Sequence, residues 1–182
     1  MFVHCQRRAL RRVGRAHRGS SRCVSGLVRH YFGSKDTLLL EAFNLLAQDF
    51  RKMLGVLDDP DRSGTSPGLR LRAAIHAVFE QLRVSRERQY AWFGFWAPSR
   101  SHTGIAEANR NLYKEILEYL EGLITEVAAL RGVDVDTALA AKGLAAILEG
   151  AWVHCGIGIS GTSVDEAEHA CLEYFSHLLG DN

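Results

Sequence analysis

The chain has 182 residues, of which 47% are hydrophobic and 24% are charged, and its formal net charge is +1. A chain of this length can bury a sizeable core, and its ordinary apolar content is typical of a soluble globular protein. Its four cysteines form no CxxC pair and no zinc-type spacing with histidine, which argues against a metal site and indicates reduced thiols in a cytoplasm.

The small net charge hides a separation of charge along the chain. Residues 1–35 contain eight Arg and one Lys but no acidic residue, whereas the remainder contains 13 basic and 21 acidic residues. A basic end on an acidic body indicates a polyanionic partner at that end and a different task for the body. A solvated basic tail without a partner is the alternative. No apolar run typical of a secretion signal follows the first arginines.

Residues 1–22 are predicted to form a basic arm that is poorly packed, or at most one frayed helix. They hold four large apolar side chains, Phe2, Val3, Leu10 and Val13. Burial of one such side chain stabilises by about 1.5–3 kcal/mol, which cannot offset the backbone entropy lost in ordering two helices.

A short helix is predicted from Gly26 to Tyr31, followed by a turn and a longer helix from Lys35. A short helix that begins with small and polar residues has the shape of a recognition helix in a DNA major groove. Its basic and phenolic side chains could reach base edges and phosphates, and Lys35 would lie at the positive end of the next helix. The predicted DNA-binding residues are Ser25, Gly26, Arg29, His30, Tyr31 and Lys35. The alternative is a surface turn in which Tyr31 and Phe32 are core residues.

Apolar residues at helical spacing predict helices over the rest of the chain. The first begins at Lys35 after a Ser34 N-cap and runs to Leu57, and residues 58–68 form a loop. Further helices are predicted at 69–84, 88–97, 105–130, from Asp134 or Asp136 to about 159, and at 164–179 after a capping box. No run alternates in the manner of a strand, so the fold class is all-α.

Two features of the region 138–161 resemble a membrane span and a dinucleotide-binding motif, but neither interpretation fits. The longest apolar stretch, 138–159, includes Lys142, Glu149 and His154, so it fits a buried helix better than a membrane span. The letters GIGISG at 156–161 match a dinucleotide fingerprint. That fingerprint requires a strand before the glycines and a helix after them, whereas a helix precedes them here. The glycines are better explained by a helix end and by close packing.

The stretch VSGLVRHYFGSKDTLLLEAF at 24–43 resembles the end of the helix-turn-helix of the TetR family of transcription regulators. His30, Tyr31, Phe32 and Lys35 carry this resemblance. The stretches AWFGFWA (91–97) and GLAAILEGAW (143–152) resemble the branch that includes the betaine-pathway repressor. The resemblance implies a DNA-reading segment at 23–45, a ligand-binding and dimerisation domain at 46–182, and a homodimer interface formed by the last two helices.

Aromatic residues in the second domain predict a ligand pocket between helices. The predicted ligand-binding residues are Trp92, Phe95, Trp96, Tyr113, Glu149 and Trp152. Tryptophan faces would suit a cation or a flat apolar ligand, although plain core packing explains the same residues equally well.

Small and apolar residues on the last two helices predict the dimer interface. The predicted interface residues are Leu139, Gly143, Ala146, Ile147, Gly150, Ala167, Cys171 and Tyr174. The alternative is that these residues form the core of a monomer.

The match to the TetR pattern begins abruptly near residue 25, where Val24-Ser25-Gly26 is one residue short of the family's Val-Ser-x-Gly. An out-of-frame or wrongly started N-terminus would produce this pattern. The alternative is a variant whose basic arm contacts phosphates. Either way, DNA binding is expected to be weak, salt-dependent and nearly independent of sequence.

The sequence therefore predicts a cytoplasmic, ligand-responsive regulator of the TetR type that acts as a repressor. Its expected partners are double-stranded DNA, a small-molecule effector and a second copy of the chain, with no membrane and no cofactor. Scattered histidines, without a nucleophile elbow or paired carboxylates, argue against an enzyme. The alternative function is a helical homodimer that binds a small molecule or a protein without specific DNA binding.

Overall fold

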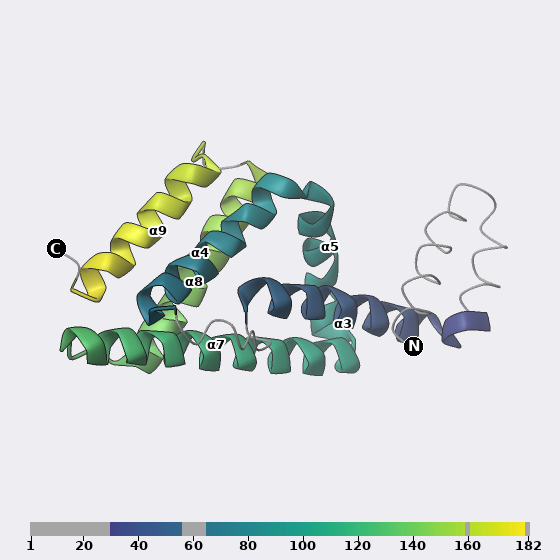
Figure 1. The fold of residues 1–182 in the computed structure, drawn as a ribbon. Helices are drawn as coiled ribbons and strands as arrows, with labels where there is room; N and C mark the ends of the chain where they lie inside the picture. The colour runs from purple at the N-terminus through teal and green to yellow at the C-terminus, as the bar shows by residue number, and fades with distance from the viewer. Residues whose placement is uncertain (1–29, 56–64, 159–160, 181–182) are drawn as a thin grey trace.

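The structure is a computed structural model that describes residues 30–55, 65–158 and 161–180. Within these ranges the regular elements are all helices, so the predicted all-α class is confirmed (Figure 1). The predicted basic arm at 1–22 and three of the predicted DNA-binding residues, Ser25, Gly26 and Arg29, lie outside the described residues.

Helix α3, Lys35–Leu54, has the predicted N-cap. The Ser34 hydroxyl accepts a hydrogen bond from the Thr37 amide at 3.0 Å, which satisfies one of the free donors of the first turn. The helix ends at Leu54 rather than at the predicted residue 57. Gly55 adopts a left-handed conformation with φ 79°, and its amide donates back to the last turn.

Helix α4, Pro67–Val84, begins two residues earlier than predicted. Ser66 caps it, and proline is well suited to the first helical position because no donor is needed there. Helix α5, Arg86–Trp96, follows after Ser85, and Pro98–Ser101 forms a single turn, α6, that was not predicted.

Helix α7, Thr103–Arg131, is the longest described helix, and His102 caps it. The Nδ1 atom of His102 accepts from the Ile105 amide at 3.3 Å. Histidine is not among the favoured N-cap residues, which explains why the predicted start was two residues late.

Helices α8, Thr137–Ile157, and α9, Val164–Leu178, complete the described chain. Asp136, and not Asp134, caps α8. Its predicted end near 159 is corrected to Ile157, because Gly158 takes a left-handed conformation with φ 67°. The predicted capping box of α9 is confirmed, with reciprocal bonds between Ser163 and Glu166.

The main core lies where α4, α7, α8 and α9 meet. Phe79, Ile124 and Leu144 are fully buried there, and burial of each side chain stabilises by about 1.5–3 kcal/mol. A smaller cluster around Phe43 and Ile105 fixes α3 against α7. Figure 1 shows α3 beside α7, with α9 at the other end of the molecule from the start of α3.

An ionic cluster joins α4 to α9. Glu168 is 8% exposed. One of its carboxylate oxygens lies 2.7 Å from Nδ1 of His76, and the other accepts from Arg83 at 2.5 Å. Arg83 also donates to Asp165 at 2.6 Å, and these carboxylates raise its pKa. The buried carboxylate thus has partners for both of its oxygens, as a buried charge requires.

Candidate functional site

A cavity of about 400 Å³ opens between five helices of the described chain. Its size is in the range of pockets that hold small organic ligands. Helix α3 contributes Phe50 and Leu54, and the remaining lining residues are Ala74, Val78 and Gln81 of α4, Trp92 and Trp96 of α5, Asn109, Leu112, Tyr113, Ile116 and Leu120 of α7, and Ala145, Leu148, Glu149 and Trp152 of α8.

Five of the six residues predicted to bind ligand line this cavity, and it takes in all three tryptophans of the chain. The exception is Phe95, which is absent from the lining. Its ring packs edge-on against Phe43 at 5.5 Å between centroids, so it supports α3 instead. Neighbouring positions on a helix point in different directions, which is why Phe95 and Trp96 are separated in this way.

Among the described residues that line the cavity, Glu149 is the one acidic residue and none is basic. Burial raises the pKa of Glu149, and burial together with the charge of Glu149 raises the pKa of Tyr113. Within the described chain the Glu149 carboxylate has no ion-pair partner. Its side chain opens to the hollow of the cavity and is exposed, while the protein around it removes part of its hydration. A carboxylate that has lost part of its hydration without gaining a partner is less favourable than one in water.

Two polar residues of the lining were missed in the sequence. Gln81 lies three residues after Val78, and Asn109 lies four residues after Ile105 and three before Leu112, so both share the inward face of their helices. A polar residue on an otherwise apolar helical face was the available signal for both.

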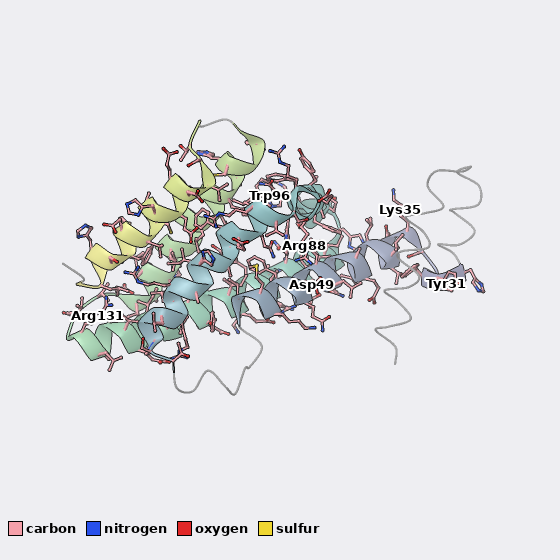
Figure 2. The ribbon with its side chains drawn as sticks, turned by 45° about the horizontal axis from the view of Figure 1, so that its top comes forward. Tyr31, Lys35, Asp49, Arg88, Trp96 and Arg131 are labelled. Carbon is pink, nitrogen blue, oxygen red and sulfur yellow. The ribbon has the colours of Figure 1, made fainter. Side chains whose placement is uncertain are left out.

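Helix α3 connects this cavity to the segment that resembles the recognition helix. Phe50 lines the cavity near the end of α3, whereas Lys35 stands at its beginning, about 22 Å away along the helix axis. Figure 2 shows Tyr31 and Lys35 at one end of the molecule, well away from Trp96. One continuous helix therefore has one end in the cavity wall and the other at the predicted DNA-binding residues.

Trp92 contacts α3 from the cavity side. Its ring packs edge-on against Phe43 at 5.9 Å and against Phe50 at 5.6 Å. Next to this contact, Arg88 of α5 lies 4.0 Å from Asp49 of α3 (Figure 2). Because of these contacts, a shift of α5 would displace α3 directly.

A second set of contacts holds α3 to α7. Arg51 donates to both carboxylate oxygens of Glu115, at 2.5 and 3.2 Å. Such a two-point bond fixes orientation as well as distance, so α7 provides a firm support for the far end of α3.

The described part of the predicted DNA-binding set is accessible. His30 and Lys35 are exposed, and Tyr31 is 43% exposed. The rings of His30 and Tyr31 pack edge-on at 4.9 Å. Phe32 is buried and anchors the turn, whereas the ring of the neighbouring Tyr31 is partly exposed to solvent.

The outer face of α8 carries four of the eight predicted interface residues. Leu139, Gly143, Ala146 and Gly150 follow one another at spacings of four, three and four, so they share one face of the helix. Leu139 is 65% exposed, and in the described part of the chain no atom beyond the neighbouring residues and backbone of α8 lies within 4 Å of where a Cβ would stand on Gly143 or Gly150. Ile157, 49% exposed, extends the same face and was missed in the sequence.

The four other predicted interface residues differ in their placement. Tyr174 of α9 is 55% exposed, and Ile147 is half-buried against the core. Ala167 and Cys171, however, are buried in the core of their own chain. Their side chains point along the inward stripe of α9, so they are not available to a partner in this arrangement. Burial and the charge of Glu168 raise the pKa of Cys171 to about 12.

The glycines of the GIGISG stretch have the structural roles that were predicted for them. Gly158 ends α8 in a left-handed conformation, and Gly156 lies in close contact with Gln89 of α5. No grouping of His, Cys, Asp or Glu suited to a metal ion occurs among the described residues. None of the described helices combines the length and the apolar character that a membrane crossing needs.

Comparison with known proteins gives a consistent result. Residues 67–180 match the family described as BetI-type transcriptional repressor, C-terminal. The chain is 26% identical over 165 residues to the HTH-type transcriptional regulator BetI 1 of Chromohalobacter salexigens, with 85% of this chain and 74% of that relative covered. It is 27% identical over 163 residues to BetI of Proteus mirabilis, with 85% of this chain and 75% of that relative covered.

A solved structure shows the same similarity at the level of the fold. It is a protein described as a transcriptional regulator of Pseudomonas aeruginosa PAO1, and it superposes with a TM-score of 0.72 at 25% sequence identity. The superposition covers 85% of this chain and 74% of that one. These similar proteins are transcription regulators, and none is described as an enzyme.

Proposed function

The chain belongs to the family of BetI-type transcriptional repressors within the TetR regulators, and from this membership we propose that its aromatic cavity binds an organic monocation that controls DNA binding. A ligand-responsive transcription regulator is the function of the family. The class of ligand, the DNA-contacting residues and the assembly are proposals for this chain.

The observation that carries the proposal is the unpaired Glu149 in a cavity walled by three tryptophans. A cation would supply the partner that this carboxylate lacks. The faces of the tryptophan rings carry partial negative charge and attract cations, most strongly where water is excluded. The many apolar lining residues favour alkyl or aryl groups on the ligand, while Gln81, Asn109 and Tyr113 could bind a polar substituent.

The proposed response runs from α5 to α3. A ligand between Trp92 and Trp96 presses on the helix whose Trp92 already packs against Phe43 and Phe50. Because α3 is continuous from the cavity to Lys35, a small tilt at one end displaces the other. We propose that this displacement changes the fit of Tyr31 and Lys35 to DNA phosphates.

We also propose that the chain acts as a cytoplasmic homodimer joined through the outer faces of α8 and α9. The exposed apolar and small residues on α8, from Leu139 to Ile157, allow close approach of a second helix. Two copies would then present two recognition segments, as DNA-binding dimers require for two half-sites.

The ligand proposal is tested by titration of the full chain with benzyltrimethylammonium and with its neutral carbon isostere, neopentylbenzene. All three tryptophans line the cavity, so their fluorescence should change with the cation. The neutral isostere should bind at least about tenfold more weakly, because it cannot pair with Glu149. Equal binding of the two compounds would show that Glu149 is not a cation site.

The DNA proposal is tested by fluorescence anisotropy with a labelled duplex from upstream of the chain's own gene. The duplex should bind, and saturating cation should shift its affinity. Binding that ignores both DNA sequence and cation would favour the alternative function, a helical homodimer without specific DNA recognition.

A further inference from the structure

Gln89 is a buried amide on α5, only 5% exposed, although most of its helix faces solvent. Its Nε2 atom donates to the backbone carbonyl of Trp152 on α8 at 3.3 Å. A buried amide is costly unless it is hydrogen-bonded, so this contact must fix where the side chain sits.

Gly156 makes room for this amide. A Cβ at Gly156 would lie 1.4 Å from Nε2 of Gln89 and 2.3 Å from its Cδ, so the amide occupies the space of a side chain. The other glycines in the interior of α8, Gly143 and Gly150, have nothing within 4 Å of the same position. Glycine weakens a helix relative to alanine, and at 156 it permits a close approach that no other residue would allow.

The contact lies next to the walls of the cavity. Trp152 and Glu149 precede Gly156 by four and seven residues on α8, and Phe93 and Trp96 follow Gln89 by four and seven on α5. Residues at these spacings share a helix face. Between the two faces the Phe93 ring packs against Trp152 at 5.0 Å and against Trp96 at 5.1 Å.

We propose that Gln89 and Gly156 form a latch that sets the spacing of α5 and α8, and with it the width of the ligand cavity. Gln89 is then a positioning residue that acts on the ligand through Trp96 and Trp152. The inference rests on the proposed function only in taking this cavity as the ligand site.

The first test needs no ligand. Gly156→Ala should expel the Gln89 amide, which is the flexible end of its side chain, and leave the helices folded. The three tryptophans all line the cavity, so acrylamide quenching of their fluorescence should rise by about twofold as the wall loosens. Far-UV circular dichroism should stay unchanged. Gly94→Ala is the matched control, because a Cβ there meets nothing within 4 Å, and its quenching should equal that of the wild type.

A double-mutant cycle separates the latch from a general effect on packing. Gln89→Ala should raise quenching as Gly156→Ala does. In the Gln89→Ala background, Gly156→Ala should add nothing further, because its clash partner is gone. Equal effects of Gly156→Ala in both backgrounds, or unchanged quenching in either single variant, would overturn the latch.

The consequence for ligand is measured with benzyltrimethylammonium. Both single variants should weaken its binding by about threefold, and the double variant should be no weaker than Gln89→Ala alone. If the wild type does not bind this cation, the ligand proposal fails, while the quenching cycle still decides whether the latch exists.

Discussion

A single carboxylate gives the cavity its chemical character. The surroundings of Glu149 remove part of the hydration of its exposed carboxylate, which raises its pKa, and no described residue forms an ion pair with it. The same property that makes it costly in the empty protein makes it useful to a cationic ligand, since the ligand restores the lost electrostatic stabilisation.

Glu149→Gln should weaken binding of benzyltrimethylammonium by about tenfold or more, because a bond to a charged partner contributes about 1.5–3 kcal/mol. Isothermal titration calorimetry measures this directly. Glu118→Gln is the control, since Glu118 is an exposed residue of α7 that pairs with Lys114 and does not line the cavity. Equal losses in the two variants would point to net charge and not to the cavity.

The raised pKa of Glu149 also predicts two pH effects of opposite sign. Cation affinity should fall as the pH is lowered through the raised pKa, because the carboxylate becomes protonated. Stability of the empty protein should change the other way. The folded state holds this proton more tightly than the unfolded state, so the stabilising contribution is present at low pH and is lost as the pH rises. Thermal melts of the wild type and Glu149→Gln, compared across pH without ligand, should converge at low pH and favour Glu149→Gln at neutral pH.

The helices show which residue patterns are informative. The capping serines at 34 and 163 fixed the starts of α3 and α9, because serine caps by a local bond that depends little on the rest of the fold. The predicted start of α7 was wrong because a histidine, His102, caps this helix. The turn α6 was not predicted because four residues are too few to show a helical repeat of apolar side chains.

Contacts between helices were less predictable. Gln89 looks like a surface residue in the sequence, and its burial depends on where α8 places Gly156. Likewise, Phe95 and Ala167 lie on faces whose neighbours are set by how the helices cross, and their roles followed only from the packing. The sequence showed that aromatic residues would surround the cavity. It did not show that the tryptophans would line the cavity while Phe95 would pack against α3.

The ionic cluster between α4 and α9 should contribute measurably to stability. Arg83→Ala leaves the nearly buried Glu168 with His76 as its remaining side-chain partner, so unfolding free energy should fall by about 1–3 kcal/mol. Urea denaturation measures this loss. Arg86→Ala, at an exposed position at the start of α5, should stay within about 0.5 kcal/mol of the wild type. Equal stability of the wild type and Arg83→Ala would mean that the cluster is too well solvated to matter.

At the scale of the whole molecule, the proposed homodimer depends on the outer face of α8. Ala146→Glu places a charge in the middle of the proposed α8 face, where burial without a partner is strongly unfavourable. Light scattering at micromolar concentration should then show a monomer, whereas the wild type should be a dimer. Ala91→Glu, an equivalent change at an exposed position of α5, should leave the dimer intact. A wild-type monomer under these conditions would rule out the interface.

Helix α8 has two working faces. One face lines the cavity with Ala145, Glu149 and Trp152. The other face is the proposed dimer interface, with Leu139, Gly143 and Ala146. A helix is about 10–12 Å across with its side chains, so in the dimer a single layer would separate each bound ligand from the neighbouring subunit. Occupation of one cavity would then alter the packing that the second cavity depends on. Such an arrangement favours cooperative binding, and the proposed control of DNA binding would then respond over a narrow range of effector concentration.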